Sequence, residues 1–270
     1  MVRKEEDNNK MIFNLKQSKL RCKQYRKRLL EISQKVSALH VGGSFSCTEI
    51  LDVLFNCIMT KEEKKLFILS KGHASIMQYI ILEDQKVLKK KDVENYCKKS
   101  GFLGVHPDIG NPGINASTGS LGHGLNMANG IALAKKKHRV FSVLSDGELQ
   151  EGSTWEGIML AGALKINNLI ILVDNNDFQS LERTSVSHPN IYPIEKKLES
   201  FGWNAFRCNG HDSKKIYSII NRRKKNKPLA IIAKTIKGFP ISFMKNQPIW
   251  HYRSPNEIEY SKAIKELDKK

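Results

Sequence analysis

Short apolar runs alternate with helix-length segments over the second half of this 270-residue chain. The runs predict β-strands because they are short and bounded by turn residues. The predicted strands are 140–144, 169–173, 204–208 and 229–233, and the predicted helices are 121–136, 154–165, 194–201 and 213–223. Strands that alternate with helices indicate a parallel sheet covered on both faces and joined by right-handed crossovers. The predicted fold class is α/β, with a doubly wound, mostly parallel sheet.

In the first half of the chain the pattern predicts a long basic helix, which the glycine-containing loop HVGGSFS stops. A second helix follows, capped by Thr48. A short buried strand then precedes a third helix, and a later stretch is too dense in Gly and Pro for regular structure. The expected ranges are 14–39 for the basic helix, 50–59 for the capped one, 66–69 for the strand, Ala74 for the start of the third helix, 100–115 for the irregular stretch and 255–267 for a last helix.

A chain of this length can bury the core of one large α/β domain. We predict a flexible N-terminus over residues 1–12 and a single domain over 13–270. The composition, 40% hydrophobic and 27% charged, is typical of a globular protein. No apolar stretch approaches the roughly 20 residues that a bilayer span needs. The charged opening MVRKEEDNNK does not resemble a signal peptide, so we expect a cytoplasmic protein without a membrane partner.

The formal net charge of +18 is also typical of basic nucleic-acid-binding proteins, so this function is one alternative. Lysines and arginines are spread along the chain in runs such as KVLKKKD and NRRKKNKP, which fits solvated helix faces at least as well as a binding stripe. We therefore do not expect nucleic acid as the partner, although the charge can steer anionic sugar phosphates toward the protein. The five cysteines are scattered and lack CxxC spacing, which indicates neither a disulfide framework nor a zinc site.

Candidate chemistry lies where two predicted strands end, because ligands of open parallel sheets bind beyond the carboxyl ends of the strands. Asp146 and Gly147 follow one strand and Asn176 follows the next, and neighbouring strands lie about 4.8 Å apart. The Asp146 carboxylate, the Asn176 amide oxygen and a carbonyl near Phe178 would then hold Mg²⁺, or another divalent cation such as Ca²⁺ or Mn²⁺. Such a site keeps positions for phosphate oxygens and water. Asp-Gly and Asn-Asn are also ordinary turn residues, so a structural role is the alternative.

The spacing of these residues carries a resemblance to a known family. The chain reads SDG, then 27 residues, then Asn175-Asn176, which resembles the thiamine-diphosphate motif of transketolases. Four further segments match transketolases in order and spacing: LHVGGS, SKGHAS, GVHPD and STGSLGHG. The resemblance covers nearly the whole chain and implies the thiamine-diphosphate-binding fold, with thiamine diphosphate and a divalent cation as cofactors. The chain departs from the family pattern at Ser145, where the motif has Gly, and at His123, where many transketolases have Gln.

Histidines are the first site residues that the resemblance implies. His40, His73, His106 and His251 would line the cofactor and substrate funnel, bind the diphosphate and the sugar hydroxyls, and help proton transfers. Histidine suits this because its pKa lies near neutrality and it can donate or accept a proton. A single histidine is more often structural, but four of the eight histidines fall in matching segments.

A glycine loop and a carboxylate complete the implied site. Gly119, Leu121 and Gly122 in STGSLGHG would form the loop over the diphosphate and the pyrimidine, where small side chains let the backbone approach a ligand. Glu151 matches a family carboxylate that links paired active sites across a subunit interface. The alternative for Glu151 is an acidic residue that favours the start of a helix. Family members often have a glycine-bearing turn after the motif, whereas this chain reads NDFQSLERT, so we expect different substrate contacts near Phe178.

In transketolases the glutamate that activates the cofactor pyrimidine lies in a second domain, beyond the region matched here. This chain ends at Lys270, after an IWH element that resembles the end of the first domain. We therefore expect a companion C-terminal transketolase subunit, which supplies the pyrimidine-binding domain and most phosphate-binding arginines in a heterotetramer. The chain would be inactive without it.

The resemblance implies a transferase of carbohydrate metabolism, for example one that acts in the pentose phosphate reactions. A two-carbon ketol (glycolaldehyde) unit would pass from a ketose or ketose phosphate to an aldose acceptor. Two alternatives stay open besides a sugar-specific transketolase. One is another thiamine-diphosphate enzyme subunit, of the deoxy-sugar synthase or 2-oxoacid dehydrogenase type, and the second is the basic nucleic-acid-binding protein.

Overall fold

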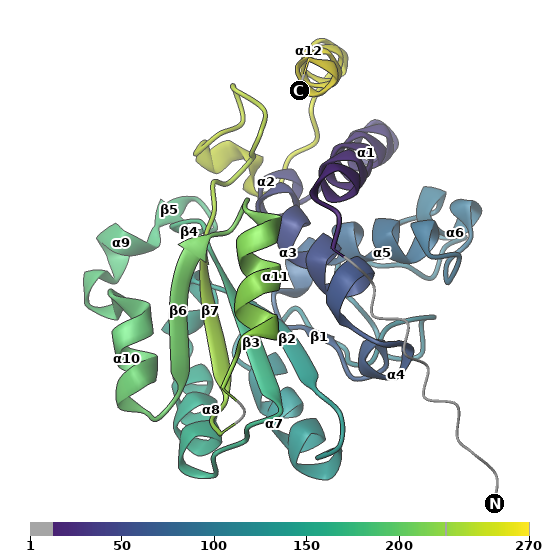
Figure 1. The fold of residues 1–270 in the computed structure, drawn as a ribbon. Helices are drawn as coiled ribbons and strands as arrows, with labels where there is room; N and C mark the ends of the chain where they lie inside the picture. The colour runs from purple at the N-terminus through teal and green to yellow at the C-terminus, as the bar shows by residue number, and fades with distance from the viewer. Residues whose placement is uncertain (1–12, 225, 270) are drawn as a thin grey trace, which may run out of the picture.

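A computed structural model of the chain describes residues 13–224 and 226–269, with a five-stranded parallel sheet at its centre (Figure 1). The strand order is β1-β2-β3-β7-β6, with β3 in the middle. The strands are β1 (Ile68–Leu69), β2 (Val140–Ser145), β3 (Leu169–Asn175), β6 (Asn204–Asn209) and β7 (Leu229–Lys234). Every residue of β2 and β3 is buried, as expected of strands covered on both faces. The predicted α/β class and the positions of the strands are confirmed.

Each face of the sheet has its own hydrophobic core, because alternate strand residues point to opposite faces. On β3, Ile170 and Leu172 belong to the larger core, whereas Leu169, Ile171 and Val173 belong to the smaller one. The helices of the larger core are α1 (Leu15–Ser33), α2 (Val41–Ser46), α3 (Thr48–Val53), α5 (Ser75–Asp84), α11 (Ser213–Asn221) and α12 (Glu257–Asp268). The helices of the smaller core are α7 (Gly124–Ala134), α8 (Gly152–Ala163) and α10 (Ile194–Ser200).

Short elements connect these layers. They are the π-helical η1 (Leu54–Ile58), the helices α4 (Lys61–Lys64), α6 (Lys90–Glu94) and α9 (Thr184–Ser187), the 3₁₀ turns η2 (Gly72–Ala74), η3 (Gly147–Gln150), η4 (Pro189–Ile191) and η5 (Pro248–His251), and the strands β4 (Phe178–Gln179) and β5 (Glu182–Arg183). The last two pair as a small antiparallel hairpin, which the sequence did not predict. The stretch 100–115 has no helix or strand, as predicted. The expected flexible N-terminus, residues 1–12, lies outside the described residues.

The prediction of a helix over 14–39 was wrong at its end, because α1 stops at Ser33. The Ser33 hydroxyl donates to the Leu30 carbonyl at 2.5 Å, and the Gln34 side-chain amide donates to the Pro255 carbonyl at 2.9 Å. Leu39 is nevertheless fully buried. The apolar pattern beyond Ser33 therefore reports burial in the larger core and not a continued helix.

The segment HVGGSFS is not the loop that we predicted, because it contains helix α2, all of whose residues are buried. A Cβ on Gly42 would lie 2.8 Å from the Trp250 carbonyl oxygen, and one on Gly43 would lie 3.3 Å from the His73 ring. The glycines therefore allow close packing. That packing outweighs the roughly 1 kcal/mol that glycine costs inside a helix.

Thr48 does not cap the next helix as predicted. Its hydroxyl donates to the carbonyls of Ser44 and Phe45, each at 3.1 Å, in the preceding helix. The N-cap residue of α3 is Cys47, which makes no side-chain cap hydrogen bond. The two helices follow each other so closely that the hydroxyl finds acceptors behind it.

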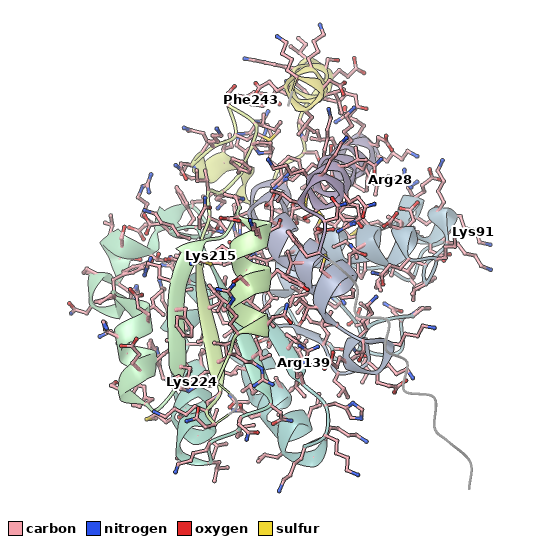
Figure 2. The ribbon with its side chains drawn as sticks, viewed as in Figure 1. Arg28, Lys91, Arg139, Lys215, Lys224 and Phe243 are labelled. Carbon is pink, nitrogen blue, oxygen red and sulfur yellow. The ribbon has the colours of Figure 1, made fainter. Side chains whose placement is uncertain are left out.

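The basic residues labelled in Figure 2 lie on separate parts of the fold: Arg28 on α1, Lys91 on α6, Lys215 on α11, Arg139 before β2 and Lys224 after α11. Two of them are ion-paired and mostly buried, Arg28 with Glu83 and Arg139 with Glu63. Within the described residues, no helix combines the length and apolarity that a membrane crossing requires.

Candidate active site

A cavity of about 300 Å³ lies at the carboxyl ends of β2 and β3. Ser145 and Asp174 stand opposite each other in the ladder, so the strands are neighbours as predicted. The predicted site residues that line this cavity are His40, His73, His106, Gly119, Leu121, Gly147, Glu151, Asn176, Phe178 and His251. Two others, Asp146 and Gly122, are direct chain neighbours of lining residues. The fold therefore brings together residues that are as far apart in the chain as His40 and His251, whereas the roles expected of them stay predictions.

Four histidines from four separate segments form a cluster on the cavity wall. The ring centroid of His40 lies 5.5 Å from that of His73, 5.1 Å from that of His251 and 6.3 Å from that of His106. Burial, together with the charge of neighbouring histidines and lysines, lowers the pKa of His40 to about 3. Burial and the Lys237 charge lower the pKa of His251 to about 4, and burial and the Lys71 charge lower that of His73 well below its usual range. These three rings are therefore neutral at pH 7 in the protein alone.

The predicted metal ligands lie just beyond the carboxyl ends of β2 and β3. The Asp146 carboxylate accepts hydrogen bonds from the backbone amides of Gly147 at 3.0 Å and Asp177 at 2.6 Å, and from the Asn175 side chain at 2.8 Å. A Cβ on Gly147 would lie 3.8 Å from the Phe178 carbonyl oxygen, so that carbonyl lies close to Gly147. The Asn176 side-chain oxygen accepts from the Phe178 amide at 3.0 Å. Asn176 and Phe178 line the cavity, and Asp146 directly precedes the lining residue Gly147, so a carboxylate, an amide and a carbonyl lie at this end of the sheet.

The residues present fit a divalent cation. Asp146 is 1% exposed, and burial raises the pKa of its carboxyl to about 7. No lysine or arginine of the described residues forms an ion pair with it within 4.0 Å. A buried carboxylate without a cationic partner is costly, and a metal ion removes that cost. Among the described residues no group of three or more His, Cys, Asp or Glu side chains is placed to hold a metal ion, so a cation here would depend on amide and carbonyl oxygens beside the one carboxylate.

The glycine loop after the irregular stretch needs its glycines. Gly119 has φ of +129° and Gly122 has φ of +89°, values in the region that favours glycine. A Cβ on Gly119 would lie 2.5 Å from the His106 ring. The Gly122 amide donates to the buried Glu148 carboxylate at 3.0 Å, which ties the loop to η3. The loop is therefore held against the cavity from both sides.

Glu151 lines the cavity and is exposed, at the position just before α8. Its side chain makes no cap hydrogen bond to the helix, so it does not cap the helix start directly. The exposed carboxylate is free to face an added surface. His123 is also exposed, just before α7, and it lines a separate groove with Ser120 and Asn126.

Sequence reasoning missed two buried lysines at this site. Lys71 is fully buried and donates to Asp174 and to the Gly43 carbonyl. Lys237 lines the cavity, donates to the Ser180 carbonyl at 2.9 Å and lies 3.3 Å from His251 Nδ1. Both follow the carboxyl end of a strand, β1 or β7. The rule that pointed to Asp146 and Asn176 would also have found them.

Ser145, which replaces the usual glycine of the motif, is accommodated without strain. It ends β2 in extended backbone, and its hydroxyl accepts the Glu148 amide at 3.2 Å. Asp174, also missed, is fully buried and accepts from Lys71, Thr235 and Ser46. It therefore anchors segments from three parts of the chain beneath the cavity.

Fold and cavity together define an α/β domain whose parallel sheet has a buried carboxylate and a histidine-lined pocket at its carboxyl edge, where proteins of this class bind their ligands. Similarity to known proteins narrows this class to a family. A family model described as "Transketolase, thiamine diphosphate binding domain" matches residues 18–263. The chain therefore belongs to the transketolase family, as its thiamine-diphosphate-binding domain.

Relatives and solved structures agree with this assignment. The apulose-4-phosphate transketolase subunit of Phocaeicola vulgatus is 32% identical over 265 residues, which cover 93% of this chain and 94% of the relative. A 6-deoxy-6-sulfo-D-fructose transketolase subunit of a Clostridium species is 32% identical over 258 residues, covering 90% and 94%. The transketolase structure of Campylobacter jejuni superimposes with a TM-score of 0.88 at 25% identity, covering 95% of this chain and 43% of that one.

Proposed function

We propose that this chain is the diphosphate- and metal-binding half of a split transketolase, which transfers a two-carbon ketol unit from a ketose donor to an aldose acceptor. The observation that carries the proposal is that Asn176, Phe178 and four histidines line one cavity, with Asp146 directly beside it. Asp146, Asn176 and Phe178 would hold Mg²⁺, or Ca²⁺ or Mn²⁺ in its place. No feature of the described residues favours a deoxy-sugar synthase, a 2-oxoacid dehydrogenase subunit or a nucleic-acid-binding protein over this function.

Thiamine diphosphate, when bound, supplies a carbon nucleophile at its thiazolium ring, and the protein positions it. His73 and Lys237 would contact the diphosphate. Burial and the charge of Lys71 lower the pKa of Lys237 to about 8. A bound anion would raise the pKa of Lys237 again and favour its charged form. His40, His106 and His251 would bind the sugar hydroxyls. The neutral rings of His40 and His251 suit this task because each can both donate and accept a hydrogen bond.

The proposal includes a companion subunit, and an apolar face of the chain supports it. Helix α7 has no charged residue and α8 has only Glu156, although 27% of the chain is charged. Four large apolar side chains of this two-helix face are roughly half exposed: Leu133, Met159, Leu160 and Leu164. A helix that is apolar on its outer side as well is normally covered. Glu151 lies at the start of α8, so a partner on this face would reach the cavity.

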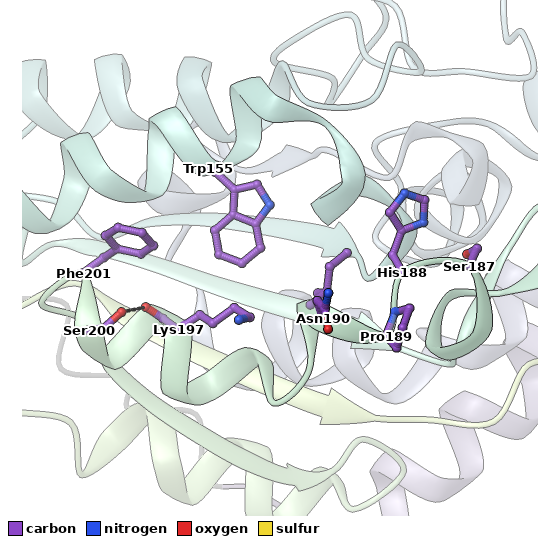
Figure 3. A pocket seen from close by; sticks show the side chains of 9 residues that line it. Trp155, Ser187, His188, Pro189, Asn190, Lys197, Ser200 and Phe201 are labelled. Carbon is purple, nitrogen blue, oxygen red and sulfur yellow. Dashed lines mark hydrogen bonds between the residues drawn. The ribbon is translucent and has the colours of Figure 1, made fainter.

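A groove of about 570 Å³ extends the face beyond α8 (Figure 3). Trp155 from α8 and Phe201 from the end of α10 lie along it, with ring centroids 6.3 Å apart. The Trp155 indole already donates to the Leu149 carbonyl at 2.6 Å, which leaves its ring as apolar surface. We therefore assign α7, α8 and this groove to the companion subunit, which would supply the pyrimidine-binding domain within a heterotetramer.

Anionic sugars are the substrate class that we propose. The cavity carries buried positive charge from Lys237 beside the neutral rings of His40, His73 and His251. Relatives named for apulose 4-phosphate and for 6-deoxy-6-sulfo-D-fructose both act on anionic sugars by their names. All five cysteines are free, which suits a reducing compartment, and we propose that the protein works in the cytoplasm.

The test is to co-express the chain with the protein encoded beside its gene and to measure ketol transfer with thiamine diphosphate and Mg²⁺. Activity is expected only when both polypeptides, cofactor and metal are present. If the purified chain alone turned over ketose donors at ordinary enzyme rates, the split-site proposal would fail. Tight, salt-sensitive RNA or DNA binding without cofactor dependence would instead favour a nucleic-acid-binding protein.

A further inference from the structure

A largely buried charge network of Arg26, Glu49 and His211 lines a separate pocket and is not part of the proposed site. The Arg26 guanidinium donates to both oxygens of Glu49, each at 2.7 Å, and to the Phe45 carbonyl at 2.9 Å. Glu49 also accepts from His211. Although burial opposes it, the charge of Arg26 and the hydrogen bond from His211 lower the pKa of Glu49 to about 2. The Arg26–Glu49 pair is therefore ionised throughout the physiological range.

His211 connects this pair to the main chain. Its Nε2 accepts the Ile236 amide at 3.0 Å, so Nε2 carries no proton and Nδ1–H donates to Glu49 at 2.9 Å. The ring also stacks on Phe239, with centroids 3.9 Å apart and planes inclined by 23°. Arg26 lies 5.5 Å from the Phe239 ring centroid. Contacts with Glu49, the Ile236 amide and Phe239 therefore fix both the position and the tautomer of the His211 ring.

The segment that His211 holds leads directly into the cavity. Thr235 donates to Asp174, Ile236 donates to His211, and Lys237 reaches the cavity, where it meets Ser180 and His251. The next residue, Gly238, donates to the Gly42 carbonyl at 3.1 Å. Among these residues, Ile236 is the one whose hydrogen-bond partner, His211, belongs to the charge network.

We propose that His211 is a positioning residue for Lys237: by accepting the Ile236 amide, it sets the lysine ammonium against the cavity. The Arg26–Glu49 pair holds His211 in the tautomer that can accept. The proposed function enters this inference at one point: it identifies the diphosphate as the anion that Lys237 would bind. The hydrogen bond itself is independent of that ligand.

Two substitutions separate positioning from simple packing. His211→Phe keeps an aromatic ring on Phe239 and removes the acceptor. His211→Gln places an amide oxygen near the position of Nε2 and keeps the acceptor, although it loses the ring. Packing alone would make the glutamine variant the worse one, whereas positioning would make the phenylalanine variant the worse one.

The experiment uses the full chain and two readouts. Hydrogen–deuterium exchange measured on peptides covering 234–241 reports the Ile236 amide, and calorimetry with magnesium pyrophosphate reports the anion site. With His211→Phe we expect faster exchange in that peptide and pyrophosphate affinity lower by on the order of tenfold, as for other residues that orient a binding group. His211→Gln should restore both readouts to near wild-type values. Unfolding midpoints would show that both variants are folded.

Exchange in His211→Phe equal to that of the wild type would overturn the inference, as would equal loss of pyrophosphate affinity in the two variants. Failure of the wild-type chain to bind pyrophosphate would count against the proposed function instead. In that case the exchange readout still decides whether His211 holds the segment.

Discussion

At the scale of single residues, one buried group in the cavity and one beside it have charged forms that the protein alone disfavours. Burial raises the pKa of Asp146 to about 7 and lowers that of Lys237 to about 8. A cation beside Asp146 and an anion beside Lys237 would each restore the charged form. Metal and diphosphate binding are therefore expected to strengthen each other.

Asp146→Ala tests the proposed metal site. Removing the carboxylate should weaken Mg²⁺-dependent binding of thiamine diphosphate by on the order of 100-fold or more, because the one charged ligand is lost. The fold should persist: the folded chain binds the Asp146 proton more tightly than the unfolded chain, so ionisation between pH 3.8 and about 7 lowers the stability of the metal-free protein. Circular dichroism checks the fold and calorimetry checks binding. Retained affinity would mean that the metal is held elsewhere.

Lys237→Met tests the proposed role of Lys237 in anion binding, through the pH dependence of the affinity for thiamine diphosphate. Below about pH 8 the ammonium is charged and favours an anionic ligand. Above about pH 8 it loses its proton, so wild-type affinity for thiamine diphosphate should fall by up to about tenfold per pH unit until the pKa of the bound state is reached. The methionine variant should bind more weakly at pH 7 and lack this component of the profile. Two parallel pH profiles would contradict the assignment.

At the scale of elements, glycines decide where segments can touch. Gly119 lies against the His106 ring in backbone that favours glycine, whereas a Cβ added to Gly130, within α7, would have no atom within 4 Å. The same residue type therefore has opposite meanings at these two positions. Only the first is required by its neighbours.

Gly119→Ala and Gly130→Ala form a matched pair. The first should lower the free energy of unfolding by about 2–4 kcal/mol, because it combines an unfavourable φ with a clash, and it should displace His106. The second should raise it by about 0.5–1 kcal/mol, because alanine has the higher helix propensity. Urea unfolding measures both. A Gly119→Ala protein as stable as the wild type would show that the loop is not tightly packed.

At the scale of the whole molecule, charge and apolar surface are separated. The chain carries a formal net charge of +18, yet α7 and α8 together contain one charged residue. Charge elsewhere favours solubility, whereas this face favours association. The cavity and the apolar face meet at Glu151, where α8 begins.

Leu160→Glu tests assembly on this face. Leu160 is 46% exposed, so the substitution should change the free energy of unfolding of the chain by less than about 0.5 kcal/mol while it prevents co-purification with the companion subunit. Ile258→Glu is the control, because Ile258 is 80% exposed on α12, in the layer of the larger core. Loss of the companion with both variants, or with neither, would contradict the assignment of the face.

Predictions from the sequence succeeded where the physics is local or periodic. Apolar runs located the strands, and the rule that ligands meet the carboxyl ends of strands pointed to Asp146 and Asn176, which lie at or beside the cavity while their ligand roles stay predictions. The same rule, applied to β1 and β7, would have found Lys71 and Lys237. The hairpin at 178–183 was missed because its strands have only two residues each, too few for a period.

The amino-acid sequence by itself determined the parallel sheet, the motif at its carboxyl edge and the family resemblance, because alternation, strand length and motif spacing are properties of neighbouring residues. Only the tertiary structure decided that HVGGSFS is helical, that α1 ends at Ser33 and that His211 supports the segment before Lys237. Each of these depends on contacts between segments far apart in the chain. Burial and close packing there outweigh the local preferences on which the sequence predictions were built.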